Sequence, residues 1–234
     1  MYDPLVLTKK TEALAVKDSL KKYYRFRSAG FYGGIATADT VGCNLRCKFC
    51  WSAASVWDAQ NTGKFYSPQE VAQELQSIAI LKGYHQLRIS GGEPTIGKQH
   101  LIEVLESIDR RFLFILETNG ILLGYEKDYV TALSRFPHLH VRVCLKGADP
   151  EEFTLLTGAS SGFECQMKAL QYLQKSQVSF NIAVVSTNAK KKQRLFAQLQ
   201  DLGLGSVMVE EEEIQMYPLV RKRLQQEQLL PYFE

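Results

Sequence analysis

Three cysteines close together in the chain are its clearest chemical signal. Cys43, Cys47 and Cys50 lie within eight residues, in a Cys-x-x-x-Cys-x-x-Cys arrangement. Thiolates are the usual protein ligands of iron–sulfur clusters, and a four-iron cluster bound by three of them leaves one iron open to an outside ligand. The spacing therefore predicts a metal-cluster loop that supports chemistry.

Other uses of these cysteines explain fewer residues. Structural zinc usually takes four ligands, whereas Cys144 and Cys165 stand alone and the four histidines show no zinc-finger spacing. A thioredoxin-like use of Cys47 and Cys50 leaves Cys43 without a role. A disulfide needs an oxidising compartment, and the first ten residues lack the pattern of a signal peptide. We therefore expect a cytoplasmic location.

The composition limits the architecture and the partners. With 234 residues and 45% hydrophobic content, the chain can form one α/β domain over residues 1–234. Its core is expected at about 35–210, between an N-terminal extension (1–34) and a C-terminal tail (211–234). The net charge of +3 is too small to indicate nucleic acid by itself. No apolar run reaches the roughly 18 to 20 residues of a membrane span, so no membrane partner is expected.

Strand and helix patterns alternate along the chain. Ser67, Pro68 and Glu70 predict a capped helix start. The alternation is typical of parallel βαβ units and predicts a (β/α)6 sheet, open or partly closed like a barrel, with an N-terminal helical segment and a short C-terminal helical tail. Strands are expected at 34–41, 86–90, 112–117, 139–145, 178–186 and 206–209. Helices are expected at 67–82, 98–110, 127–134, 150–156, 163–175 and 190–202.

Polar features follow several of the predicted strands. They are Cys43, Gly91-Gly-Glu-Pro94, Glu117-Thr-Asn-Gly120, Lys146 and Ser186. Active sites of such folds lie at the carboxyl ends of the strands. We therefore expect these features to meet at one edge of the sheet.

Two of these motifs resemble those of radical S-adenosylmethionine (SAM) enzymes. Phe49 precedes the last cysteine, as an aromatic residue does in that superfamily, and Gly91-Gly-Glu-Pro94 resembles its second hallmark. The resemblance covers about residues 35–210 and implies a partial (β/α)6 barrel. It also implies that SAM binds the open iron of one [4Fe–4S] cluster, whose ligands are Cys43, Cys47 and Cys50.

The resemblance further implies that reduction of bound SAM yields a 5′-deoxyadenosyl radical, which abstracts hydrogen from a substrate. It implies contacts of Phe49, Gly91, Gly92 and Pro94 with SAM, and a bond from the Glu93 carboxylate to the SAM ammonium. The missing side chains of the two glycines would let their backbone approach the methionine moiety.

Other features resemble activating enzymes of glycyl-radical proteins. Glu117 and Asn119 belong to an acidic-Thr-Asn-Gly run like theirs, which implies a place near SAM. Lys146 resembles the lysine of their Asp-x-Lys motif, which implies a catalytic lysine that pairs with the SAM carboxylate, although Cys144 replaces the aspartate. The resemblance also assigns the backbone near Val185 to adenine.

Several charged residues keep two interpretations. Arg88 and Arg142 alternate with apolar neighbours, so each points either into the barrel beside an anion or outward. Lys21–Arg27 mixes basic and aromatic residues, which fits either substrate gripping or an N-terminal helix with solvated lysines. Glu210–Glu213 fits either a cation site or a solvated acidic turn.

The leading hypothesis is a radical SAM enzyme that abstracts hydrogen, with activation of a glycyl-radical protein as its leading form. The alternatives are RNA or nucleoside modification, cofactor biosynthesis, and a non-enzymatic iron–sulfur electron-transfer or metal-binding module. The expected partners are a protein or small-molecule substrate that caps the open barrel and a one-electron donor such as flavodoxin or ferredoxin. Nucleic acid is a less favoured partner.

Overall fold

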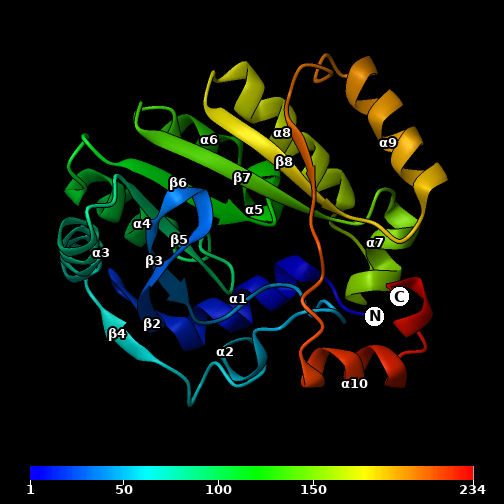
Figure 1. The fold of residues 1–234 in the computed structure, drawn as a ribbon, viewed down its shortest axis with the longest axis horizontal. Helices are drawn as coiled ribbons and strands as arrows, with labels where there is room; N and C mark the ends of the chain where they lie inside the picture. Colours follow the sequence, from blue (N-terminus) through cyan, green and yellow to red (C-terminus); the bar gives the residue numbers. More distant parts are fainter. Residues whose placement is uncertain (234) are drawn as a thin grey trace.

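The computed structural model describes residues 1–233, which are organised around one curved sheet (Figure 1). The strands follow the order β1-β2-β3-β5-β6-β7-β8-β9, with β4 paired to β2. The strands are β1 (Val16–Lys17), β2 (Leu20–Ala29), β3 (Ile35–Thr40), β4 (Lys64–Tyr66), β5 (Gln86–Gly91), β6 (Leu113–Thr118), β7 (Leu139–Lys146), β8 (Ser179–Val185) and β9 (Val209–Glu211).

The part of the sheet from β3 to β9 is parallel, as the alternation of elements predicted. Helices surround the sheet, and α2 and α10 lie next to each other at its lower edge in Figure 1. The α-helices are α1 (Pro4–Ala15), α2 (Ala53–Trp57), α3 (Pro68–Lys82), α4 (Lys98–Ser107), α5 (Ile121–Tyr125), α6 (Lys127–Leu133), α7 (Pro150–Thr157), α8 (Phe163–Lys175), α9 (Ala189–Asp201) and α10 (Pro218–Gln226). Two short 3-10 helices are η1 (Phe31–Gly33) and η2 (Leu230–Tyr232).

The start of α3 shows how local sequence sets an element. The Ser67 hydroxyl accepts a hydrogen bond from Glu70 N, and the Glu70 carboxylate accepts one from Ser67 N. Pro68 occupies the first helical turn, where no backbone donor is needed. The helix ends at Gly83, which has the left-handed conformation that glycine adopts without strain. The predicted capping box is confirmed.

Strand register brings the predicted site to one edge of the sheet. Thr40 at the end of β3 pairs with Gly91 at the end of β5, and Lys146 at the end of β7 pairs with Val185 at the end of β8. The segments after these strands therefore begin side by side, as the sequence predicted.

The segment Lys21–Arg27 forms β2, not the helix that we considered for it. It pairs antiparallel with β3 and β4, and Lys21 and Lys22 are buried. The helical parts of the N-terminal segment are α1 and the short 3-10 helix η1. Among the described residues, no helix combines the length and apolar character that crossing a membrane requires.

Candidate active site

The cysteine loop begins where β3 ends, and hydrogen bonds join it to the turn that follows β5. Gly92 N donates to the Thr40 carbonyl over 2.9 Å, and Glu93 N donates to the Gly42 carbonyl over 2.7 Å. A Cβ atom on Gly92 would overlap the Gly42 carbonyl oxygen. The cysteine loop and the Gly-Gly-Glu-Pro turn therefore form one unit.

This packing gives a second reason for the paired glycines. Gly91 has a φ of +95°, and a Cβ atom there would stand 2.7 Å from the backbone nitrogen of Thr40. Both glycines are thus required by the close approach to β3 and to the cysteine loop. Backbone packing is enough to select glycine at positions 91 and 92.

The three loop thiols fit the ligand set of an iron–sulfur cluster. None of the five cysteines forms a disulfide. Burial raises the pKa of all three loop thiols, that of Cys43 to about 12, while nearby cations oppose this: Arg46 at Cys43, Lys146 at Cys47 and Cys50. Iron that replaces the protons would keep the thiolates charged in this buried place.

The arrangement of possible metal ligands bears on the zinc alternative. No group of three His, Cys, Asp or Glu side chains in residues 1–233 is placed to hold a single metal ion. A four-iron cluster binds its thiolates through different iron atoms, so its ligands are spread over more space than those of one ion.

The Glu93 carboxylate is occupied within the protein. It is 1% exposed. One oxygen accepts hydrogen bonds from the Thr95 nitrogen and hydroxyl and from the Thr118 hydroxyl, and the other accepts one from Asn119 N over 2.8 Å. In this structure Glu93 therefore ties the turn after β5 to the turn after β6.

Asn119 continues this network into the cysteine loop. Its side-chain amide donates to the side-chain oxygen Oδ1 of Asn44 over 2.7 Å. The Asn44 amide in turn donates to the Thr8 hydroxyl on α1, and the Thr11 hydroxyl donates to the Cys43 carbonyl. Buried side chains from α1 and from the β6 turn thus hold the first half of the loop.

Lys21 supports the same region from β2. Its fully buried ammonium group lies 3.2, 2.7 and 2.6 Å from the carbonyl oxygens of Glu93, Pro94 and Ile96. Burial lowers the pKa of Lys21 to about 7, against the opposing effect of the Glu93 carboxylate. This lysine fixes the course of the chain through the Gly-Gly-Glu-Pro turn.

The barrel interior carries paired charges. Arg88 lies 3.0 Å from Glu117, and Arg142 lies 3.1 Å from Glu210 and 3.9 Å from Glu117. Both arginines are largely buried, with side chains 6% and 13% exposed. The inward interpretation with an anionic partner is confirmed for both, and Glu117 is one of those partners.

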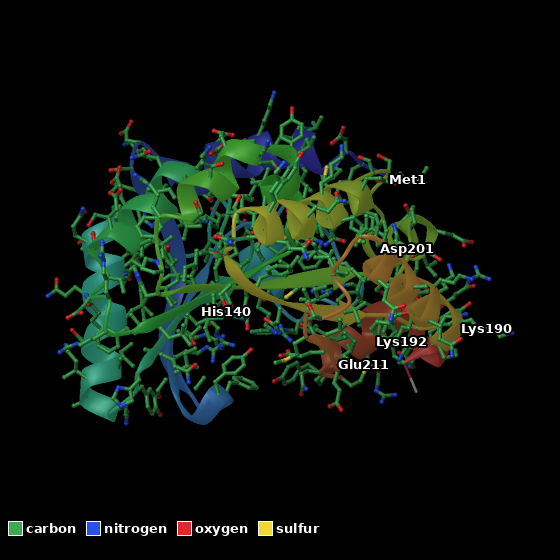
Figure 2. The ribbon with its side chains drawn as sticks, turned by 90° about the horizontal axis from the view of Figure 1, so that it is seen from above. Met1, His140, Lys190, Lys192, Asp201 and Glu211 are labelled. Atoms are coloured by element: carbon green, nitrogen blue, oxygen red, sulfur yellow. The ribbon has the colours of Figure 1, made fainter. Side chains whose placement is uncertain are left out.

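The first three residues of the acidic run pair with cationic side chains of the protein itself. Because it continues β9, its side chains alternate: Glu210 pairs with Arg142 and Glu212 with Lys146, whereas Glu211 pairs outward with Lys192 on α9. Figure 2 shows Lys192 and Glu211 next to each other. The strand expected at 206–209 in fact begins at Val209.

Lys146 lies between the strand ends and the cysteine loop. Its ammonium nitrogen is 3.4 Å from Glu212 and 5.7 Å from the centre of the Phe49 ring. Burial works against its charge, but the Glu212 carboxylate together with Cys144 and Cys47 outweighs burial and raises the pKa of Lys146. Lys146 is therefore a cation held beside the loop.

Val185 lines a cavity of about 340 Å³ at the ends of β8 and β9. Its walls are formed by Val185, Ser186, Glu211, Glu212, Glu213, Ile214 and Phe233. The Phe233 ring also packs against Phe49 at a centroid distance of 6.1 Å. The cavity thus opens next to the cysteine loop and Lys146.

The C-terminal segment holds the second half of the loop. The Arg223 guanidinium donates to the Cys50 carbonyl over 2.6 Å and lies 4.3 Å from the centre of the Trp57 ring. Lys48 pairs with Glu227 over 2.9 Å. These contacts come from α10 and the residue that follows it.

Sequence reasoning missed the residues that support the site from a distance. Their partners are mostly backbone carbonyls, which leave no motif in the sequence. These residues are Thr8, Thr11, Lys21, Asn44 and Arg223. The capping box at α3 was visible because both of its partners are side chains three residues apart.

Fold and site together define a class: an iron–sulfur enzyme built on a partial (β/α)6 barrel. The family model described as the radical SAM superfamily matches residues 38–193, most of the chain. The chain belongs to the radical SAM superfamily.

Curated relatives of several activities match parts of the chain. A probable GTP 3′,8-cyclase from Thermococcus kodakarensis is 28% identical over 149 residues, which cover 62% of this chain and 46% of that protein. A 7-carboxy-7-deazaguanine synthase from Methanothermobacter thermautotrophicus is 33% identical over 82 residues, 35% of this chain and 31% of that protein. A putative glycyl-radical enzyme activating enzyme from Methanocaldococcus jannaschii is 28% identical over 149 residues, 63% and 52%. The chain spans about half or less of these relatives.

Solved structures share the fold. SuiB from Streptococcus suis has 20% identity and a TM-score of 0.55, covering 76% of this chain and 39% of that chain. The structure of anSMEcpe with bound AdoMet and the Cp18Cys peptide has 18% identity and a TM-score of 0.56, covering 77% and 50%. These likenesses support the partial barrel.

Proposed function

We propose that this protein cleaves SAM reductively and uses the 5′-deoxyadenosyl radical to take a hydrogen atom from a substrate. The observation that carries this proposal is the hydrogen-bonded unit of cysteine loop and Gly-Gly-Glu-Pro turn, in a member of the radical SAM superfamily. When bound, one [4Fe–4S] cluster supplies the electron and an open iron for SAM. Its ligands in this proposal are Cys43, Cys47 and Cys50.

The remaining residues have two kinds of role in this proposal. Phe49, Lys146, Val185 and the Gly91–Pro94 backbone face SAM, with Lys146 exchanging Glu212 for the SAM carboxylate. Glu93, Glu117 and Asn119 act as positioning residues, because their side chains are already engaged within the protein. A cytoplasmic location, which keeps the thiols reduced, belongs to the same proposal.

Anaerobic reconstitution tests the proposal directly. Protein loaded with iron and sulfide, reduced with dithionite and supplied with SAM is expected to form 5′-deoxyadenosine. Cys47→Ser is expected to abolish this product, whereas Cys165→Ser, which removes a cysteine outside the loop, leaves it unchanged. A wild-type protein that holds about four iron atoms and forms no 5′-deoxyadenosine would contradict the proposal.

The charged side chains of the barrel interior favour a small polar molecule as the substrate. Charged groups of both signs line it, including Arg88, Arg142 and Glu210, and such groups fix the orientation of a polar ligand. The names of two relatives refer to GTP and to a deazaguanine. Deuterium in a candidate purine nucleotide is expected to appear in 5′-deoxyadenosine if that compound is the hydrogen donor.

Activation of a glycyl-radical protein is a second candidate. The relative from Methanocaldococcus jannaschii and the Glu117–Gly120 run support it. In that case the deuterium comes from a glycine Cα of a partner protein, and a stable glycyl radical appears in its electron paramagnetic resonance spectrum. Transfer from the nucleotide without any partner protein would exclude this candidate.

A further inference from the structure

The cysteine loop with α2 and the helix α10 form an exposed surface that is basic and aromatic. We call it the loop–α10 surface and define it as the side chains of residues 42–57 and 218–226 that reach solvent. Trp51 and Trp57 on it are 46% and 43% exposed. The two segments contain no acidic residue and five basic ones: Arg46, Lys48, Arg221, Lys222 and Arg223. Lys48 is paired with Glu227, the residue that follows α10, so the excess of positive charge comes from the arginines and Lys222.

Contacts connect this surface to the cysteines. Arg223 touches the Cys50 carbonyl with one end of its guanidinium group and lies 4.3 Å from the centre of the Trp57 ring. Trp51 directly follows Cys50 in the chain. Trp51 is thus the chain neighbour of the last cysteine, and Trp57 is connected to that cysteine through the single side chain of Arg223.

The opposite side of the loop faces the protein interior. Cys47 and Phe49 are 8% and 7% exposed, and Phe49 packs against Phe233 and lies near Lys146. A substrate that enters the barrel meets that inner side. The loop–α10 surface is the outer side, which leaves it free for a different partner.

Apolar area accompanies the positive charge on α10. Leu219 is 61% exposed and precedes Arg223 by four residues, so the two side chains share one face of the helix. Exposed aromatic and aliphatic groups beside cations are typical of protein interfaces. Clustered charge of one sign selects a partner of the opposite sign and speeds its association.

We propose that the loop–α10 surface docks an acidic protein that carries single electrons. The inference rests on the proposed function, which consumes one electron for each SAM. The carrier loses that electron; the bond between C5′ and sulfur of SAM breaks to give methionine and the 5′-deoxyadenosyl radical; the radical gains a hydrogen atom from the substrate. Electron transfer slows steeply with distance, so the carrier must rest close to the cysteines.

The test compares a protein donor with a small one. Lys222→Glu reverses a charge on the surface at an exposed side chain, and Lys168→Glu makes the same change at an exposed side chain of α8. With reduced flavodoxin or reduced ferredoxin as donor, we expect Lys222→Glu to raise the donor KM for 5′-deoxyadenosine formation about tenfold, and less at high salt. With dithionite, both variants are expected to match the wild type.

Direct binding provides a second readout. Oxidised flavodoxin and ferredoxin titrated onto the wild type and both variants are expected to bind Lys222→Glu about tenfold more weakly, with no change for Lys168→Glu. The inference would be overturned if both variants lost the same amount of binding affinity, or if Lys222→Glu bound both carriers as tightly as the wild type does. If Lys222→Glu weakens binding of a single-stranded oligonucleotide and leaves both carriers unaffected, the surface binds nucleic acid and the inference is wrong. Inactivity with dithionite contradicts the proposed function, whereas the binding titration still decides the docking surface.

Discussion

The cysteine loop, residues 43–50, is held in different ways in its first half, around Cys43 and Asn44, and in its second half, around Lys48 and Cys50. Buried side chains hold the first half: Thr11 reaches the Cys43 carbonyl and Asn119 reaches Asn44. Partly exposed groups hold the second half, where Lys48 pairs with Glu227 at side-chain exposures of 22% and 44%. The first half is built like a protein core and the second like a surface.

This difference matters energetically. Leaving a buried donor or acceptor without its partner costs about 1–3 kcal/mol, whereas an exposed ion pair contributes about 0–1 kcal/mol. The first half therefore gives the cluster a fixed reference, next to the proposed SAM site. The second half can adjust its contacts, as a docking surface requires.

The largest expected effect on stability comes from Gly92→Ala, which disturbs the packing of the turn after β5 against the start of the buried first half. The new Cβ overlaps the Gly42 carbonyl, and the two backbones must separate, so we expect a loss of roughly 3–4 kcal/mol in the free energy of unfolding. Chemical denaturation measures it. Gly30→Ala is the matched control, because Gly30 has an ordinary φ and open space around its Cβ position. Equal stability of the two variants would contradict the packing argument.

Acid provides a second way to weaken the buried half. His100 on α4 bonds the Tyr23 hydroxyl and the Ser19 carbonyl, and so anchors β2, which carries Lys21. Burial lowers the pKa of His100 to about 4, while in the unfolded chain it is about 6.5. The unfolded state therefore binds more protons between these values, and stability falls as the pH drops from 6.5 to 4.

The His100→Gln variant isolates this contribution. Its stability is expected to vary less between pH 6.5 and pH 4 than that of the wild type, by an amount on the order of 3 kcal/mol. Denaturation at a series of pH values measures the slope. The exposed His85, replaced in the same way, serves as the control. An unchanged slope in His100→Gln would show that other groups govern the acid response.

The smallest expected effect comes from Arg223→Met in the second half of the loop. We expect a loss below about 1 kcal/mol in stability but faster amide hydrogen exchange in residues 48–57. Lys222→Met is the control, because Lys222 is an exposed neighbour on the same helix, whereas Arg223 is the residue that donates to the Cys50 carbonyl. If Arg223→Met destabilised the protein as much as Gly92→Ala, the contrast between the two halves would disappear.

The parallel sheet and its functional edge could be predicted from the sequence. Strand periodicity, the capping box at Ser67 and the glycine-rich turn after β5 are all local signals, and each is present in the structure. The paired arginines were also predictable in part, because an apolar strand does not bury Arg88 or Arg142 without an anion.

The support of the site was not predictable. Lys21 looked like a solvated helix residue, yet it is buried against carbonyls more than 70 positions away. The strand that enters Glu210–Glu213 could not be recognised, because four identical residues show no alternation of polar and apolar side chains. Only their ion-pair partners alternate between the two faces of the strand. Long-range backbone acceptors and uniform runs carry no local pattern.

The contact between Arg223 and Cys50 has a consequence for the order of synthesis. The two residues are 173 positions apart, and a ribosome adding about 5–20 residues per second needs roughly 9–35 s to cover that interval. During this time the thiols are already translated while their outer clamp is not. The outer contact of the loop can therefore form only after α10 has been translated, and until then the loop depends on the contacts of its first half.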